Sequence, residues 1–134
     1  MELNGELILS DSAAGKLRQL MGIKDYIIEQ GVSGNWTYYK YASGYADLWW
    51  RGTVTPTSYT AVGSMVYTNI IRLSMPFGVT GNVVVTGTGD NLHILTNVDW
   101  SYANKTVSFR LLRAASMALG EQVVALRVMG KWKA

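Results

Sequence analysis

The residues best suited by type and spacing to bind a ligand lie in the segment 99–105, which reads DWSYANK. Large aromatic side chains in a polar connection are hard to assign to a core, and loops on rigid scaffolds commonly carry function. Aromatic rings stack on the C–H faces of sugars, and neighbouring polar groups bind the hydroxyls. This pattern predicts stacking by Trp100 and Tyr102 and hydrogen bonds from Asp99, Asn104 and Lys105. The alternative is that the two rings only anchor the loop.

Residues with the spacing of known catalytic or metal sites are scarce. His93 is the one histidine, and its place in an alternating pattern favours a structural or surface role. The chain has no cysteine, and no nucleophile elbow or phosphate-binding glycine loop is present. The five aspartates and four glutamates show no spacing that marks a glycosidase pair. We therefore expect a protein that is not an enzyme and that uses no cofactor and no metal.

The composition is that of one folded domain. In 134 residues, 49% are apolar, which is sufficient for a packed core. No apolar run approaches the roughly 20 residues of a membrane helix, and the acidic, polar start does not resemble a signal peptide. The net charge of +3 is uneven, because six Lys and Arg residues follow Asp99 against Glu121 alone. Such a basic end suits an anionic polymer, either nucleic acid or a cell-wall glycan, or is simply a solvated strand face.

The periodicity predicts one short helix followed by strands. Ala13, Leu17 and Leu20 recur at helical spacing behind Ser12, so we expect a helix over residues 12–21. From residue 26 onward the apolar residues alternate in short runs between glycine-rich turns. About eight strands are expected, over residues 26–29, 35–41, 45–51, 64–73, 83–86, 92–98, 107–111 and 124–128. This spacing predicts an all-β fold, an antiparallel β-sandwich of jelly-roll type over residues 26–134, preceded by a neck over residues 1–25.

Aromatic residues are concentrated in residues 34–50, which read GNWTYYKYASGYADLWW. Alternation around a Ser-Gly turn predicts a β-hairpin. Trp36, Tyr38 and Lys40 then lie on one face, and Thr37, Tyr39 and Tyr41 lie on the other. Because both faces are rich in aromatic rings, we expect one face in the core and the other against another surface, such as a second subunit.

These aromatic residues also carry a resemblance to a known family. The stretch WTYYKYASGYADLW at residues 36–49 resembles a hairpin of the form WTYRKWxSGxAEcWg, and the ending GKWK at residues 130–133 is similar to GRWK. Both features are typical of the C-terminal head domain of bacteriophage tail-fibre and minor tail proteins. The resemblance covers roughly residues 12–134.

The resemblance implies a virion structural protein at the distal tail, made in the cytoplasm of the host bacterium. Its function would be to attach the particle to a bacterial surface polysaccharide without catalysis. The implied partners are two further copies in a homotrimer and the remaining fibre shaft or tail proteins. We expect no nucleic-acid partner and no membrane insertion.

Three other functions remain open at this point. A purely structural tail or baseplate oligomerisation module would use its aromatic residues only for protein contacts. A glycan-degrading tailspike normally needs a longer chain. A bacterial lectin or tailocin fibre would share the same parts.

Overall fold

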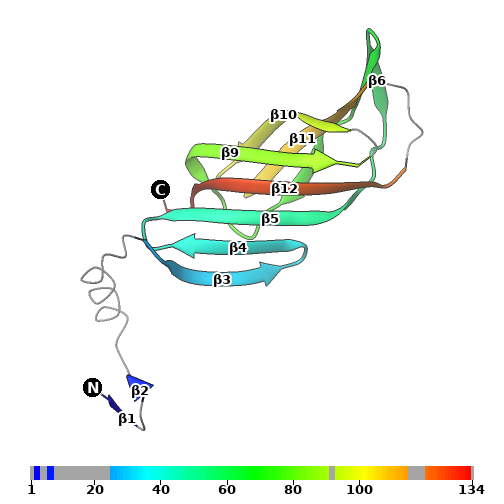
Figure 1. Cartoon of the computed structure of the whole chain (residues 1–134). Helices are drawn as coiled ribbons and strands as arrows, with labels where there is room; N and C mark the ends of the chain where they lie inside the picture. Colours follow the sequence, from blue (N-terminus) through cyan, green and yellow to red (C-terminus); the bar gives the residue numbers. More distant parts are fainter. Residues whose placement is uncertain (1, 4–5, 8–24, 91–92, 115–119, 134) are drawn as a thin grey trace.

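Antiparallel β-strands make up the part of the chain that the structure, a computed structural model, describes (Figure 1). The described residues are 2–3, 6–7, 25–90, 93–114 and 120–133. The predicted helix over residues 12–21 lies outside them. Near the N-terminus, β1 (Glu2–Leu3) and β2 (Glu6–Leu7) form a short antiparallel pair.

The first large sheet has five strands. In spatial order they are β3 (Ile27–Ser33), β4 (Trp36–Tyr41), β5 (Tyr45–Val54), β12 (Gln122–Lys131) and β9 (Thr80–Gly89). Figure 1 shows that the last strand of the chain, β12, lies between β5 and β9.

The second large sheet is centred on β11 (Thr106–Arg113). Its other strands are β10 (Ile94–Ser101) on one side of β11, and β7 (Met65–Thr68), β6 (Tyr59–Val62) and β8 (Ile71–Ser74) on the other. Strands β7 and β8 both pair with β11, one after the other along its length.

The core lies between the two sheets. Every second residue of β12 is buried, and β11 shows the same alternation. This period of two places one side of each strand in the core and the other side outward. The inward residues include Leu48, Trp50, Val124, Leu126, Val128, Val107, Phe109 and Leu111. The predicted all-β antiparallel sandwich is therefore confirmed.

A side-chain hydrogen bond joins the two sheets at one end of the sandwich. The indole Nε1 of Trp36 on β4 donates a hydrogen bond of 2.7 Å to the carbonyl oxygen of Ser74 on β8. Within the second sheet, the amide of Met75 donates to the carbonyl oxygen of Lys105, also at 2.7 Å, and continues the pairing of β8 with β11. Trp36 thus satisfies its polar atom while its ring remains in the core, as a buried indole requires.

The aromatic hairpin has the predicted faces. Trp36 and Tyr38 pair with the buried residues Trp50 and Leu48, so they lie on the inner side of the sheet. Tyr39, the next residue along the strand, lies on the outer side. The turn before β5 contains Gly44, whose φ of 97° is costly for any residue with a Cβ.

The predicted strand over residues 64–73 is wrong in one respect, because the chain breaks there into β7 and β8. Thr68 is fully buried, and its hydroxyl accepts a hydrogen bond from the amide of Leu111 while donating one to the carbonyl oxygen of Asn69. The Asn69 side chain in turn accepts hydrogen bonds from the amides of Thr57 and Ser58. After this break the outward and inward positions exchange, so Tyr67 faces outward and Ile71 inward.

Candidate functional site

The segment predicted to bind a ligand forms the end of the β10–β11 hairpin. Asp99, Trp100, Tyr102, Asn104 and Lys105 are all exposed, and the two aromatic residues retain 39% and 44% of their accessible surface. The structure therefore presents both rings to solvent at one end of the sandwich.

The sequence predicted a loop over residues 99–105. In the structure β10 continues to Ser101, so the connection to β11 is shorter. Trp100 pairs with the buried Val107 and lies on the inner side of the sheet, where the end of the sandwich leaves it exposed. Asp99 pairs with Ser108 on the outer side. Successive strand residues point to opposite faces, so the structure separates Asp99 from Trp100. A bulge between Thr96 and Asp99 shifts the register, and the sequence pattern did not predict it.

The hairpin end is held in place by its neighbours. The amide of Asn104 donates to Ser101 Oγ at 3.1 Å, and Lys105 adopts a φ of 56° to close the turn. Gly78 lies directly against Tyr102, since a Cβ at Gly78 would overlap the Tyr102 carbonyl oxygen and lie 3.1 Å from its ring. Because Met75 also binds the carbonyl oxygen of Lys105, the segment around Gly78 supports the hairpin end from below.

The carboxylate of Asp99 already has a local role. Its Oδ1 accepts a hydrogen bond of 2.8 Å from the amide of Trp100. This contact fixes the aspartate at the start of the hairpin end and leaves its other oxygen without a contact among the described residues.

A second candidate surface is the outer face of the five-stranded sheet. At its centre, Asp47 on β5 and Arg127 on β12 form a bidentate ion pair, with Nε to Oδ1 at 3.0 Å and Nη2 to Oδ2 at 2.6 Å. The hydrogen bond to Asp47, and then its charge, raise the pKa of Arg127 above its ordinary value. The guanidinium also lies 4.9 Å from the ring centre of Trp49. The rings of Trp49 and Tyr39 are nearly perpendicular, with their centres 5.5 Å apart. Sequence reasoning missed this cluster, because Arg127 lies 80 positions from Asp47.

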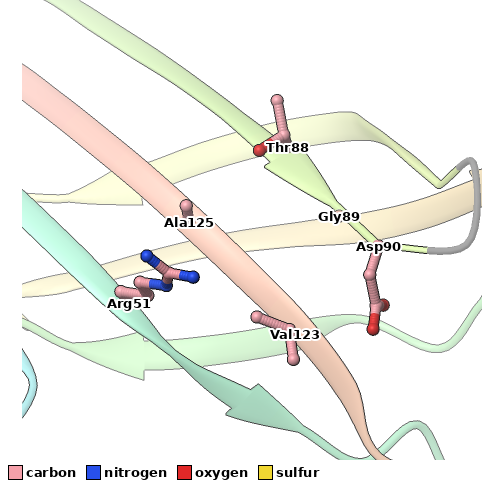
Figure 2. Close-up of a pocket in the computed structure, with 6 residues that line it drawn as sticks. All are labelled: Arg51, Thr88, Gly89, Asp90, Val123 and Ala125. Carbon is pink, nitrogen blue, oxygen red and sulfur yellow. The ribbon is translucent and has the colours of Figure 1, made fainter.

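A shallow hollow of about 350 Å³ lies on the same face, beside this cluster (Figure 2). The strand register places Ala125 between Arg51 on β5 and Thr88 on β9, and the small alanine leaves the floor open. Figure 2 shows Arg51 extending toward β12, with the carboxylate of Asp90 at the far end of the hollow. The hollow thus combines the guanidinium of Arg51, the hydroxyl of Thr88 and the carboxylate of Asp90 on an open sheet face.

Apolar side chains are exposed on this outer face and at its β3 edge. They are Ile27, Ile28, Val32, Tyr45, Trp49, Val84 and Val123. Grouped apolar exposure of this kind is typical of a surface that contacts another molecule.

The one histidine of the chain lies at the turn before β10. His93 is buried, and its Nδ1 lies 2.6 Å from the carbonyl oxygen of Asp90. A carbonyl oxygen can only accept, so Nδ1 carries the proton and the ring closes the turn before β10. Within residues 25–90, 93–114 and 120–133, no three His, Cys, Asp or Glu side chains are grouped to hold a metal ion.

Comparison with models of protein families, with curated proteins and with solved structures finds no match for this chain. In its described segments, no helix has the length and apolar character needed to span a bilayer.

Proposed function

We propose that this protein is the receptor-binding head of a bacteriophage tail fibre or minor tail protein, and that it attaches the particle to a bacterial surface polysaccharide without catalysis. The observation that carries the proposal is the exposure of Trp100 and Tyr102 at a supported hairpin end. Rings held in place by the scaffold bind with little loss of conformational entropy, which favours recognition of a flat sugar face.

The resemblance in sequence gains support from a contact between its two parts. Trp132, in the C-terminal GKWK segment, donates from Nε1 to the carbonyl oxygen of Tyr41 and from its amide to that of Gly44. Lys40 lies 5.1 Å from the Trp132 ring centre. The hairpin and the C-terminal segment thus form one structural unit, as expected if they belong to one family pattern.

In this proposal the head works as a homotrimer attached to a fibre shaft or other tail proteins at the distal end of the virion. Three copies would convert weak contacts at each hairpin end into useful avidity. Equilibrium sedimentation at micromolar concentration tests this part, because a monomer under these conditions would contradict the trimer for this chain.

The test of receptor binding uses the fluorescently labelled protein with a panel of bacterial strains and purified cell-wall polysaccharides. The variant is Trp100→Ala with Tyr102→Ala, and the matched control is Tyr45→Ala, which removes a similarly exposed ring on the other sheet. Strain-selective binding that is lost in the folded double variant but kept in the control supports the proposal. Binding retained by the double variant would place the site elsewhere, and binding to no strain or polysaccharide would contradict the proposal.

The second candidate function is a structural oligomerisation module of the tail or baseplate. It is favoured by the exposed apolar side chains on the outer face of the five-stranded sheet, such as Val32 and Val123. A stable oligomer that binds no polysaccharide, and that dissociates on Val32→Lys with Val123→Lys, would favour this function over receptor binding.

A further inference from the structure

A hollow of about 440 Å³ lies on the outer face of the second sheet, away from the core. Its floor is β11, one wall is the bulged part of β10, and the other is the β6–β7 hairpin. Its polar lining consists of Arg110, Thr96 and Asn97, and its apolar lining includes Met65, Tyr67 and Leu112.

Arg110 in this floor is held in one orientation. Its guanidinium carbon lies 5.1 Å from the ring centre of Tyr67, and its Nη1 donates a hydrogen bond of 3.1 Å to the carbonyl oxygen of Thr68. Stacking on an aromatic ring and a backbone hydrogen bond together restrict a side chain that otherwise has many rotamers.

The charge of Arg110 is not neutralised within the described residues. None of their carboxylates lies within 4.0 Å of its guanidinium, and its Nε is buried without an acceptor among them. Among the described residues, one hydrogen bond is made by the five guanidinium N–H donors, to Thr68. Native proteins leave few buried donors unpaired, and each of these asks for an explanation.

Arg110 and Arg127 differ in whether a carboxylate neutralises their charge. Both arginines lie on an outward sheet face and stack on an aromatic ring, but Arg127 forms an ion pair with Asp47, which lies diagonally across from it on β5. The direct cross-strand neighbour of Arg110 is the neutral Thr96, and Asp99, which lies diagonally across on β10, forms no ion pair with it. Arg110 therefore has the geometry of a paired arginine without the anion.

The wall of the hollow on β10 is also unusual. Asn97 has a φ of 51° and lies within the bulge of this strand. Bulges redirect side chains and are frequent beside functional sites. Here the bulge places the amide side chain of Asn97 next to Thr96. The Thr96 hydroxyl and the Asn97 amide therefore line the hollow together with the Arg110 guanidinium.

We propose that this hollow binds an oxyanion, a carboxylate or a phosphate, carried by a small ligand with a partly apolar body. The free edge of the Arg110 guanidinium binds the anion, because this planar fork matches the oxygens of such groups. Thr96 and Asn97 bind neighbouring polar atoms, and Met65 with Leu112 contacts the apolar body. The inference does not rest on the proposed function, since this hollow and the Trp100–Tyr102 hairpin end share no residue.

The test is an NMR titration of the ¹⁵N-labelled full chain with sodium glucuronate, glycerol phosphate and, as the neutral match, glucose. We expect one or both acids to shift the Arg110 Nε resonance and the amides of Thr96 and Asn97, while glucose leaves them unchanged. Whichever acid binds identifies the source of the oxyanion. Equal shifts with glucose, or no shift with either acid, would overturn the inference.

Variants separate this site from general charge effects. Arg110→Met should weaken binding at least ~10-fold, equivalent to about 1.4 kcal/mol. Arg72→Met, which removes another exposed arginine from the same outer face, should leave binding unchanged. Should Arg110→Met fail to fold, Thr96→Glu keeps the arginine and sets a carboxylate directly across from it, which should also block binding. Undiminished binding in the folded Arg110 or Thr96 variant would contradict the proposal.

Discussion

Trp132 and Tyr41 are joined by a hydrogen bond of 3.1 Å from the indole Nε1 to the backbone carbonyl oxygen, across 91 positions of the chain. The amide of Trp132 also donates to the carbonyl oxygen of Gly44 at 2.9 Å. These contacts attach the end of β12 to the turn between β4 and β5. The ring at this position therefore has a structural role that the sequence pattern alone did not indicate.

Trp132→Phe should lower the free energy of unfolding by about 0.5–1.5 kcal/mol, because it removes the indole hydrogen bond and leaves the Tyr41 carbonyl oxygen with the amide of Gly44 as its remaining donor. Trp100→Phe is the matched control, since the Trp100 indole makes no hydrogen bond to a described residue and should change stability by less than about 0.5 kcal/mol. Urea denaturation of both variants gives the comparison. Equal effects would show that the Trp132 hydrogen bond contributes nothing.

Asp47→Asn should lower the free energy of unfolding by about 1–2 kcal/mol, because it weakens a bidentate, charge-assisted contact. The Asp47 side chain is only 10% exposed, although Arg127 is 44% exposed, so solvent reduces the effect. Glu29→Gln, which breaks the exposed ion pair with Lys40, should cost less than about 0.5 kcal/mol. Thermal unfolding at matched salt distinguishes the two, and a larger effect of the Glu29 change would contradict this ranking.

Gly78→Ala should destabilise the protein by about 1–3 kcal/mol, because the new methyl group overlaps backbone at Tyr102 and one segment must move. It should also change the amide chemical shifts of the hairpin end. Gly120→Ala is the control, since a Cβ there meets nothing within 4 Å, and its effect should be neutral or slightly stabilising. Unchanged shifts at Tyr102 in the Gly78 variant would argue against the support described here.

The pKa of Asp25 is lowered from its ordinary value of 3.8. Burial acts in the opposite direction but is outweighed by hydrogen bonds from the side chain and amide of Ser43 and from the amide of Tyr26. A lowered pKa in the folded state stabilises the protein above the unfolded-state pKa, and this stabilisation is lost as the pH falls through the folded-state value.

Ser43→Ala should therefore raise the pKa of Asp25 toward 3.8 and reduce its contribution to stability above that pH. The Cγ resonance of Asp25, followed by NMR from pH 6 to 2, reports the change directly. Ser101→Ala, which removes a serine hydroxyl from the other sheet, should leave the Asp25 titration in place. An unchanged midpoint in the Ser43 variant would contradict the assigned cause.

Much of the fold follows from the alternation of apolar residues. The hairpin faces at Trp36 and Tyr39 and the buried side of β12 were predictable, because a period of two decides which residues enter a core. The break at Asn69 was not, because it depends on a buried threonine that binds a strand distant in sequence. Strand β6 has four residues and is mostly exposed, so it was too short to give an alternating apolar signal.

The candidate sites were only partly predictable. Exposure of Trp100 and Tyr102 followed from their polar surroundings, whereas the extension of β10 to Ser101 places Asp99 and Trp100 on opposite faces of the sheet. The partners of Arg127 and the isolation of Arg110 depend on cross-strand register. Register is set by long-range pairing, so a single sequence did not reveal either arrangement.

The central position of β12 affects how the protein folds during its synthesis on the ribosome. Strands β5 and β9 are synthesised before β12. Each has an unpaired edge until β12 emerges and hydrogen-bonds to both. Unpaired edges attract other chains. Translation that stalls before residue 122 would therefore yield a product with unpaired strand edges, which is prone to aggregate.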